Sequence, residues 1–262
     1  MFYVYGIVPA KATASGAPGG IDDTEVSVVN EGELAALVSE LTGPAYDPET
    51  ISESSGDMDW VAPRAKSHDL VLTWASDRGP VIPLAMFTST FRSLDAVRDM
   101  LRARAPELKP LMARVSRGRE YALRVYRVDA ELKAALPRLS EEMAKLQAAA
   151  QAASPGQRYL LERKLDERSK EEIRAASQRA AAEIRDALSR VCLDTATSPI
   201  PRITTDAPGT MILNAAFLIA PDGLRPFQEK LTAIVNDQQP NGFRFDFTGP
   251  WPAYHFALGD AR

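Results

Sequence analysis

The chain has 262 residues, of which 45% are hydrophobic and 25% are charged, enough apolar material for one large domain or two small ones. The 31 basic and 35 acidic residues give a net charge of −4, which argues against a nucleic acid partner because phosphate binding needs a concentrated basic surface. The single cysteine, Cys192, excludes an intrachain disulfide and favours a reducing compartment.

The hydropathy pattern predicts neither a signal peptide nor a membrane-spanning segment. The first residues, MFYVYGIVPAKATASG, have no basic region followed by a long apolar region, so they predict a strand instead. The longest apolar run, near Met211–Ala220, contains Asn214 and is far too short to span a bilayer. We therefore expect neither a membrane span nor export.

The first half of the chain alternates strand patterns with helical ones. Phe2–Val8 is aromatic and β-branched and ends at Pro9, as strands do. Helical spacing of apolar residues predicts a helix over Asp59–Ser76, and Ser93 is placed to cap a later helix. The polar, turn-rich stretch Gly43–Gly56 predicts an exposed loop. The elements expected here are strands over 2–8, 26–29 and 34–38, a helix over 59–76, an interrupted strand over 81–84 and 86–90, and helices over 93–101 and on to residue 115.

Arg117-Gly118-Arg119 is the expected boundary between two domains, residues 1–117 and residues 118–262. Beyond it, alternating and helical patterns again follow one another, and Pro137 is expected in the first turn of a restarted helix. The elements expected here are a strand over 120–128, helices over 129–153 and 157–191, a weak strand over 192–197, a strand over 210–219, a helix over 226–235 and a strand over 242–247.

This second half therefore has the order β–α–β–β–α–β, which is typical of a ferredoxin-like α+β fold with a four-stranded antiparallel sheet. The fourth strand of that order lies beside the first, and we expect 242–247 to lie inside the sheet, held by three phenylalanines. The aromatic, proline-rich tail after it, FTGPWPAYHFA, is then expected to be fixed by packing. Accordingly, Trp251→Ala is predicted to destabilise the C-terminal domain by a few kcal/mol, the usual cost of losing a buried aromatic ring.

Few residues suggest catalysis or metal binding. His68-Asp69 has the chemistry of an acid–base pair or a metal ligand, but a helix histidine beside an exposed acid explains it better. His255 lacks an accompanying nucleophile motif, and Cys192 at a helix end among apolar neighbours is expected to be a small buried filler. With one cysteine and two distant histidines a zinc site is not expected, and phosphate-binding glycine motifs are absent. We therefore predict no catalytic, cofactor-binding or metal-binding residue.

Charged residues are interpreted mainly as solvated surface. The adjacent acids Asp22-Asp23 and Glu141-Glu142 carry no further pattern. On the helix over 157–191, Asp166 with Lys170 and Asp186 with Arg190 have the favourable acid-first spacing of four residues. Its alanine-rich stretch, 175–182, allows close approach of another helix, either in a hairpin with the preceding helix, which we favour, or on a partner protein.

Four segments together resemble the gas vesicle protein F/L family: YVYGIVP at Tyr3–Pro9, SHDLVL at Ser67–Leu72 followed by VIPL, SPGQRYLLERK at Ser154–Lys164, and TGPWPAYHFA at Thr248–Ala257. The last is the most specific, and the resemblance covers essentially the whole chain. One departure is visible: where the family often shows a run like P-L-R-F-G, this chain has PLAMFTSTF over Pro83–Phe91. The resemblance does not decide between an F-like and an L-like protein.

This resemblance implies two α+β domains, the first a modified ferredoxin-like unit and the second ferredoxin-like with a long helical hairpin. It further implies a non-enzymatic accessory protein of gas vesicle assembly, without cofactors, whose partners are the apolar major shell protein and other accessory proteins, in the cytoplasm and at the gas vesicle. Two alternatives stay open at this point, a small-molecule enzyme on a ferredoxin-like scaffold and, less favoured, an RNA-binding module. The lack of a basic–aromatic run in TMILNAAFLIA, at Thr210–Ala220, argues against the second alternative.

Overall fold

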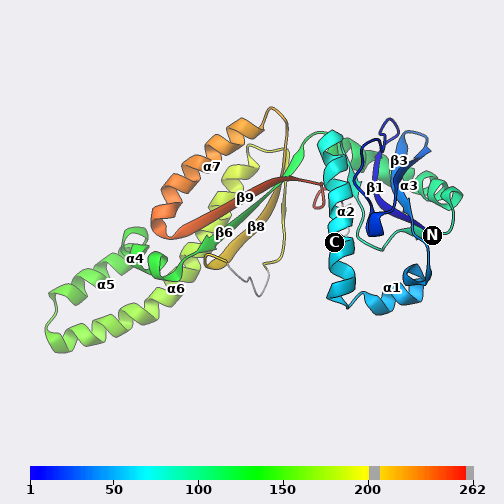
Figure 1. Cartoon of the computed structure of the whole chain (residues 1–262). Coiled ribbons are helices and arrows are strands. Elements are labelled where there is room, and N and C mark those ends of the chain that lie inside the picture. Colours follow the sequence, from blue (N-terminus) through cyan, green and yellow to red (C-terminus); the bar gives the residue numbers. More distant parts are fainter. Residues whose placement is uncertain (201–206, 258–262) are drawn as a thin grey trace. The chain divides into compact units, whose positions relative to one another are not determined.

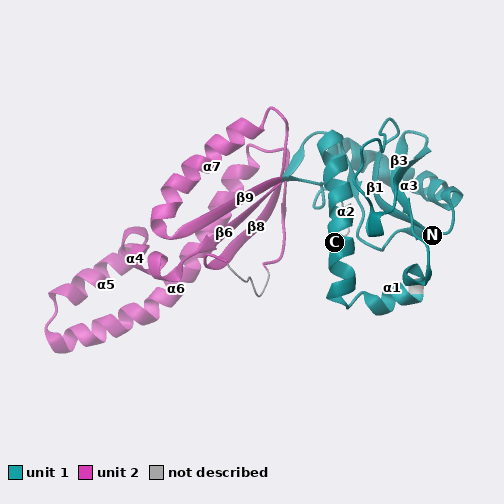
Figure 2. Cartoon of the chain, in the orientation of Figure 1, with its two compact units in different colours: residues 1–120, 250–262 teal, residues 121–249 magenta. Residues whose placement is uncertain are grey.

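A computed structural model describes residues 1–200 and 207–257, which form two compact units (Figure 2). Unit 1 comprises Met1–Glu120 and the C-terminal segment from Pro250, and unit 2 comprises Tyr121–Gly249. The chain passes from one unit to the other within strand β6 (Arg119–Arg127) and returns within strand β9 (Phe243–Trp251). The closing aromatic segment thus packs with the N-terminal unit, whereas the sequence pattern grouped it with the second domain.

The sheet of unit 1 is built around β1 (Phe2–Pro9), whose residues 3–8 are all buried. Its strand order is β2-β3-β1-β4, with the small strand β5 also paired to β1. In place of the interrupted strand expected over 81–90, the structure has two short strands, β4 and β5. Each is two residues long, and each pairs separately with β1. The remaining strands are β2 (Val26–Glu31), β3 (Leu34–Glu40), β4 (Ile82–Pro83) and β5 (Thr90–Phe91).

Three α-helices accompany this sheet in the described residues: α1 (Pro48–Ser54), α2 (Met58–Arg78) and α3 (Leu94–Val115). Ser93 caps α3 as predicted, since its hydroxyl accepts a bond of 3.1 Å from the backbone N–H of Ala96. The expected loop over 43–56 is wrong in part, because it holds α1 and a short 3₁₀ turn, η2 (Pro44–Tyr46). That stretch folds back because Tyr46 is buried in the core of unit 1.

Unit 2 has the strand order β7-β8-β6-β9, so its fourth strand lies beside its first, the order of a ferredoxin-like sheet. β7 (Asp194–Thr197) is the weak strand that the sequence suggested, and β8 (Thr210–Ile219) is antiparallel to it. The expectation that the final strand lies inside the sheet is wrong. In the part of the chain that the structure describes, β6 alone pairs with β9, which is therefore an edge strand.

The same order, with the fourth strand beside the first, relates the two units. In unit 1 the connection from β1 to β2 contains a 3₁₀ turn, η1 (Ile21–Asp23), where unit 2 has helices between its first two strands. Unit 1 therefore differs from unit 2 in the connection between its first two strands, which has a short turn in place of helices.

Unit 2 carries α4 (Asp129–Leu139), α5 (Glu141–Ala152), α6 (Pro155–Ser189), α7 (Leu224–Gln238) and a 3₁₀ turn, η3 (Gln239–Asn241). The break between α4 and α5 falls at Ser140, whose hydroxyl accepts from the N–H of Met143, and not at Pro137, which lies inside α4. α5 and the first half of α6 form a hairpin that extends beyond the sheet of this unit (Figure 1).

The alanine-rich face of α6 is used inside the protein. Ala176 and Ala180 are buried and belong, with Ile184 and Leu188, to the core between α6 and the sheet. The stretch therefore packs inside the protein, but in the core beside the sheet and not in the hairpin with α5 that the sequence favoured. Over the described residues, every helix is too short or too polar to cross a membrane.

Candidate functional site

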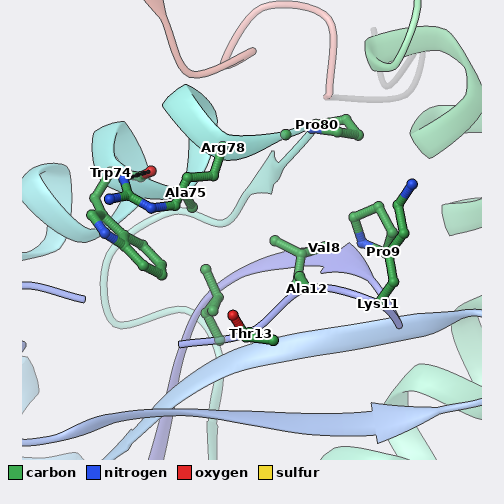
Figure 3. A pocket seen from close by; sticks show the side chains of 11 residues that line it. Val8, Pro9, Lys11, Ala12, Thr13, Trp74, Ala75, Arg78 and Pro80 are labelled. Carbon is green, nitrogen blue, oxygen red and sulfur yellow. Dashed lines mark hydrogen bonds between the residues drawn. The ribbon is translucent and has the colours of Figure 1, made fainter. Parts of the chain in front are cut away.

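An accessible apolar recess of unit 1 lies where β1 ends and α2 ends. Figure 3 shows Trp74, Ala75 and Arg78 of α2 on one side, facing the segment that follows β1. The recess has a volume of about 430 Å³. We call it the α2 groove, and its lining residues are Val8, Pro9, Lys11, Ala12, Thr13, Leu37, Trp74, Ala75, Arg78, Gly79 and Pro80.

The α2 groove combines an apolar floor with a positively charged rim. Val8 and Leu37 at its floor are almost fully buried, while Lys11 and Arg78 are exposed. The Arg78 guanidinium lies 4.5 Å from the centre of the Trp74 ring and donates a hydrogen bond of 3.1 Å to the Trp74 carbonyl oxygen. A groove of this kind can accept an apolar side chain of a partner and place an acidic neighbour of that side chain near the rim.

His68 is buried and hydrogen-bonded, and does not face solvent as a catalytic base would. Its Nδ1 lies 2.6 Å from the Tyr3 hydroxyl, and its ring stacks on Tyr5 at 5.7 Å between centres. Burial lowers the pKa of His68 to about 4 and raises the pKa of Tyr3 well above its usual value. At neutral pH the Tyr3 hydroxyl is therefore protonated and the imidazole is neutral, and His68 belongs to the core of unit 1.

Asp69, next in the helix, holds the C-terminal segment against unit 1. The Tyr254 hydroxyl donates a hydrogen bond of 2.9 Å to its carboxylate, and burial, together with the negative charge of Asp69, raises the pKa of Tyr254. Phe256, two residues later, is fully buried, with the Arg114 guanidinium 5.6 Å from the centre of its ring. The tail is thus fixed by packing, but on the unit that the sequence analysis did not expect.

A second carboxylate, Glu120, anchors the same segment through His255. The Glu120 side chain is buried and accepts a bond of 3.0 Å from the His255 backbone N–H, while its other oxygen lies 2.6 Å from His255 Nδ1. This hydrogen bond raises the pKa of the His255 imidazole. The stabilisation is therefore complete below the ordinary histidine pKa of 6.5 and is lost as the pH rises through the raised value.

Glu120→Gln should lower the pKa of His255, because the imidazolium loses the carboxylate that stabilises its charge. With only two histidines in the sequence, a proton NMR titration can follow both rings separately. Asp69→Asn is the matched control and should leave the His255 titration in place. An unchanged pKa in Glu120→Gln would show that the ion pair does not form in solution.

The departure from the family pattern has a structural counterpart at Phe87. Counted from Pro83, Phe87 stands where the family-like run P-L-R-F-G has its glycine, and it adopts a φ of 58°, a region that favours glycine. Its ring packs 5.4 Å from Tyr3 and 5.1 Å from Trp60, measured between ring centres. These contacts offset the backbone strain of a large residue in the left-handed region.

The other singled-out residues are held in structural interactions. The Cys192 thiol is half-buried, with burial raising its pKa, and lies 3.3 Å from the Thr195 hydroxyl, so it is neither a fully buried filler nor an activated nucleophile. Asp22 pairs with Arg64 at 2.7 Å and Glu142 with Arg168 at 2.9 Å, so these acids are more than solvated surface.

Two acids of α6 pair directly with residues other than those four positions on. Asp166 hydrogen-bonds Lys133 of α4, and Asp186 bonds the adjacent Arg185 at 2.8 Å. Tyr159 and Leu160, in the SPGQRYL segment at the start of α6, are about two-thirds exposed. Within residues 1–200 and 207–257, three or more side chains of the types that ligate metals do not gather at any point.

The α2 groove escaped the sequence analysis because its walls come from three separate segments. The only local signals were the short loop after Pro9 and the Arg78-Gly79-Pro80 stop of α2, and neither predicts that the two meet. The hydrogen bonds between Glu120 and His255 and between Asp69 and Tyr254 likewise join residues more than 130 positions apart in the chain.

A family model described as gas vesicle synthesis protein GvpL/GvpF matches residues 1–258. The chain belongs to the GvpL/GvpF family. The resemblance read from the four sequence segments is thereby confirmed, and it holds over nearly the whole length.

Relatives of the family agree with this assignment. Gas vesicle protein L of Streptomyces sp. (strain CB03234) is 25% identical over 97% of this chain and 92% of its own length. Gas vesicle protein L1 of Halobacterium salinarum is 24% identical over 97% of this chain and 89% of its own length.

Solved structures of GvpF show that the fold is shared. The protein from Microcystis aeruginosa superposes with a TM-score of 0.65 at 22% identity, covering 98% of both chains. The protein from Anabaena sp. PCC7120 gives a TM-score of 0.68 at 19% identity, covering 99% of this chain and 96% of its own. The α+β architecture with two sheets is therefore that of GvpF proteins.

Proposed function

We propose that this protein acts in the cytoplasm at the growing gas vesicle, where it binds the apolar major shell protein and other accessory proteins during assembly. The observation that carries the proposal is the family match over residues 1–258. An apolar shell subunit that has not yet assembled exposes strand surface that aggregates. A chaperone-like partner needs a recess that takes apolar side chains, and the α2 groove supplies one in unit 1.

The proposal also holds that the protein is not an enzyme. The three side chains that the sequence offered as candidates for catalysis are held in structural interactions. His68 is buried and neutral, His255 is tied to Glu120, and burial raises the pKa of the Cys192 thiol. This arrangement gives an enzyme on a ferredoxin-like scaffold little support.

The direct test is a pull-down of purified shell protein by the purified full-length chain, combined with deletion of its gene in a strain that forms vesicles. We expect capture of the shell protein and loss of buoyant vesicles. Normal vesicles in a deletion strain without any paralogue would contradict a role in assembly.

A blocked α2 groove should weaken binding of the shell protein by at least about tenfold, since a bulky side chain occupies the space that the partner needs. Thr13 is exposed at the groove, so Thr13→Trp fills it without disturbing the core. Thr42→Trp is the matched control, because Thr42 is also exposed but follows β3 at the opposite end of β1. Isothermal titration calorimetry on both variants separates the outcomes, and equal affinities would exclude the groove as the contact surface.

A further inference from the structure

Among the described residues, no strand pairs with the outer side of β9, the edge strand of unit 2. β9 is the terminal strand of the sheet in the described part of the chain, and it begins with Phe243-Arg244-Phe245-Asp246-Phe247. Such an edge can pair with a further strand unless charge, proline or a bulge protects it. Pro250 interrupts β9 only near its end.

One hydrogen bond shows which backbone groups face outward. The Gly242 carbonyl oxygen accepts from the Val128 N–H at 2.8 Å, so it points toward the end of β6. Because a trans peptide places the oxygen and the next N–H on opposite sides, the Phe243 N–H points away from β6. The alternation of an extended strand then directs the N–H and C=O of Phe245 and Phe247 outward as well.

The Phe243 carbonyl agrees with this direction, since it accepts a bond of 3.1 Å from the Arg244 guanidinium and not from a strand. A second groove runs beside the same edge, with a volume of about 470 Å³, between α7 residues Leu231 and Val235 and the three phenylalanines of β9. Phe245 and Phe247 are only partly buried there, so the edge offers both hydrogen-bonding groups and apolar space.

The charges on β9 identify the strand that fits. Read in the antiparallel direction about Phe245, the run Phe-Arg-Phe-Asp-Phe places Arg244 opposite Asp246 and Asp246 opposite Arg244. We propose that two copies of this chain pair through β9, antiparallel, with Phe245 of each copy on the two-fold axis. The pairing joins two four-stranded sheets into one and is self-complementary, as a two-fold dimer requires.

The existing ion pairs extend this complementarity. Arg124 of β6 lies 3.3 Å from Asp246, and Arg244 contacts Glu131 at 2.7 Å. Across the dimer the order becomes Arg124, Asp246, then Arg244 and Glu131 of the second copy, with charges of alternating sign. On the other face, phenylalanines of the second copy fill the groove beside α7 and extend the apolar surface of the sheet.

Charge reversal tests the pairing in solution. In the full-length protein, Arg244→Asp and Asp246→Arg each place like charges opposite one another, and each should weaken the dimer at least about tenfold. Mixing the two variants should restore a dimer, because positions 244 and 246 are then both acidic in one chain and both basic in the other. Sedimentation equilibrium over a concentration series gives the dissociation constants, with circular dichroism as the control for folding.

A cysteine placed on the proposed axis tests the register itself. In a Cys192→Ser background, Phe245→Cys brings two thiols together across the axis, within the roughly 7 Å between Cα atoms that a disulfide allows. Phe247→Cys is the matched control, because its two copies are separated by four residues along the strand, about 13 Å. With oxidised glutathione as the oxidant, only Phe245→Cys should yield a covalent dimer on a non-reducing gel.

Two results would overturn the proposal: a wild-type protein that sediments as a monomer at every concentration, or equal cross-linking at both positions. A monomer whose β9 variants instead lose the shell protein would mean that the edge receives a strand of that partner.

Discussion

Phe256→Ala is expected to lower the free energy of unfolding of unit 1 by about 3–5 kcal/mol, the usual cost of truncating a fully buried aromatic side chain. Phe256 has no exposed surface, and its neighbours Ala253 and Ala257 are also buried. The loss therefore combines the apolar surface returned to water with a cavity that rigid neighbours cannot fill. It also removes the contact of the ring with the Arg114 guanidinium.

Trp251→Ala serves as the comparison and should cost less, because 39% of Trp251 is exposed whereas Phe256 is fully buried. This corrects the expectation from the sequence, in which Trp251 was the buried anchor of the second domain. All three tryptophans of the chain lie in unit 1, so their fluorescence in a urea titration reports the unfolding of that unit. Equal losses in the two variants would show that Phe256 is not the anchor of the segment.

The order of the secondary structure was largely predictable from the sequence. Strand alternation and helical spacing are local properties, and β1, β8 and α6 follow them closely. Position within a sheet is not local. The three phenylalanines of β9 look the same in a central strand as in an edge strand, and only the observed strand order shows that β9 is at the edge.

The histidines and the carboxylates that hold the C-terminal segment were harder to interpret for the same reason. His68 and Asp69 are adjacent in the sequence but face different surroundings, since His68 points into the core and Asp69 bonds the tail. Glu120 resembled the first residue of an ordinary strand, and its burial beside His255 follows from the return of the chain to unit 1. Contacts between residues so far apart in the chain leave no periodic pattern in the sequence.

Acid should destabilise unit 1 mainly through His68. Its pKa is about 4 in the folded state against an ordinary value of 6.5, so the unfolded chain takes up a proton before the folded chain does. The stability that the neutral His68 contributes is therefore complete above pH 6.5 and falls by about 3 kcal/mol as the pH drops toward 4. His255 acts in the opposite sense, but only above pH 6.5, since its folded pKa is raised.

The contribution of His68 can be isolated with His68→Gln, which keeps a hydrogen-bonding group for the Tyr3 hydroxyl but does not titrate. Urea unfolding of the wild type and the variant is compared at several pH values between 7 and 4. As the pH falls from 7 to 4, the free energy of unfolding of the wild type should decrease by about 3 kcal/mol more than that of His68→Gln. Parallel pH profiles would mean that the folded protein binds the proton at His68 as readily as the unfolded chain does, which is incompatible with a buried, neutral imidazole at the centre of unit 1.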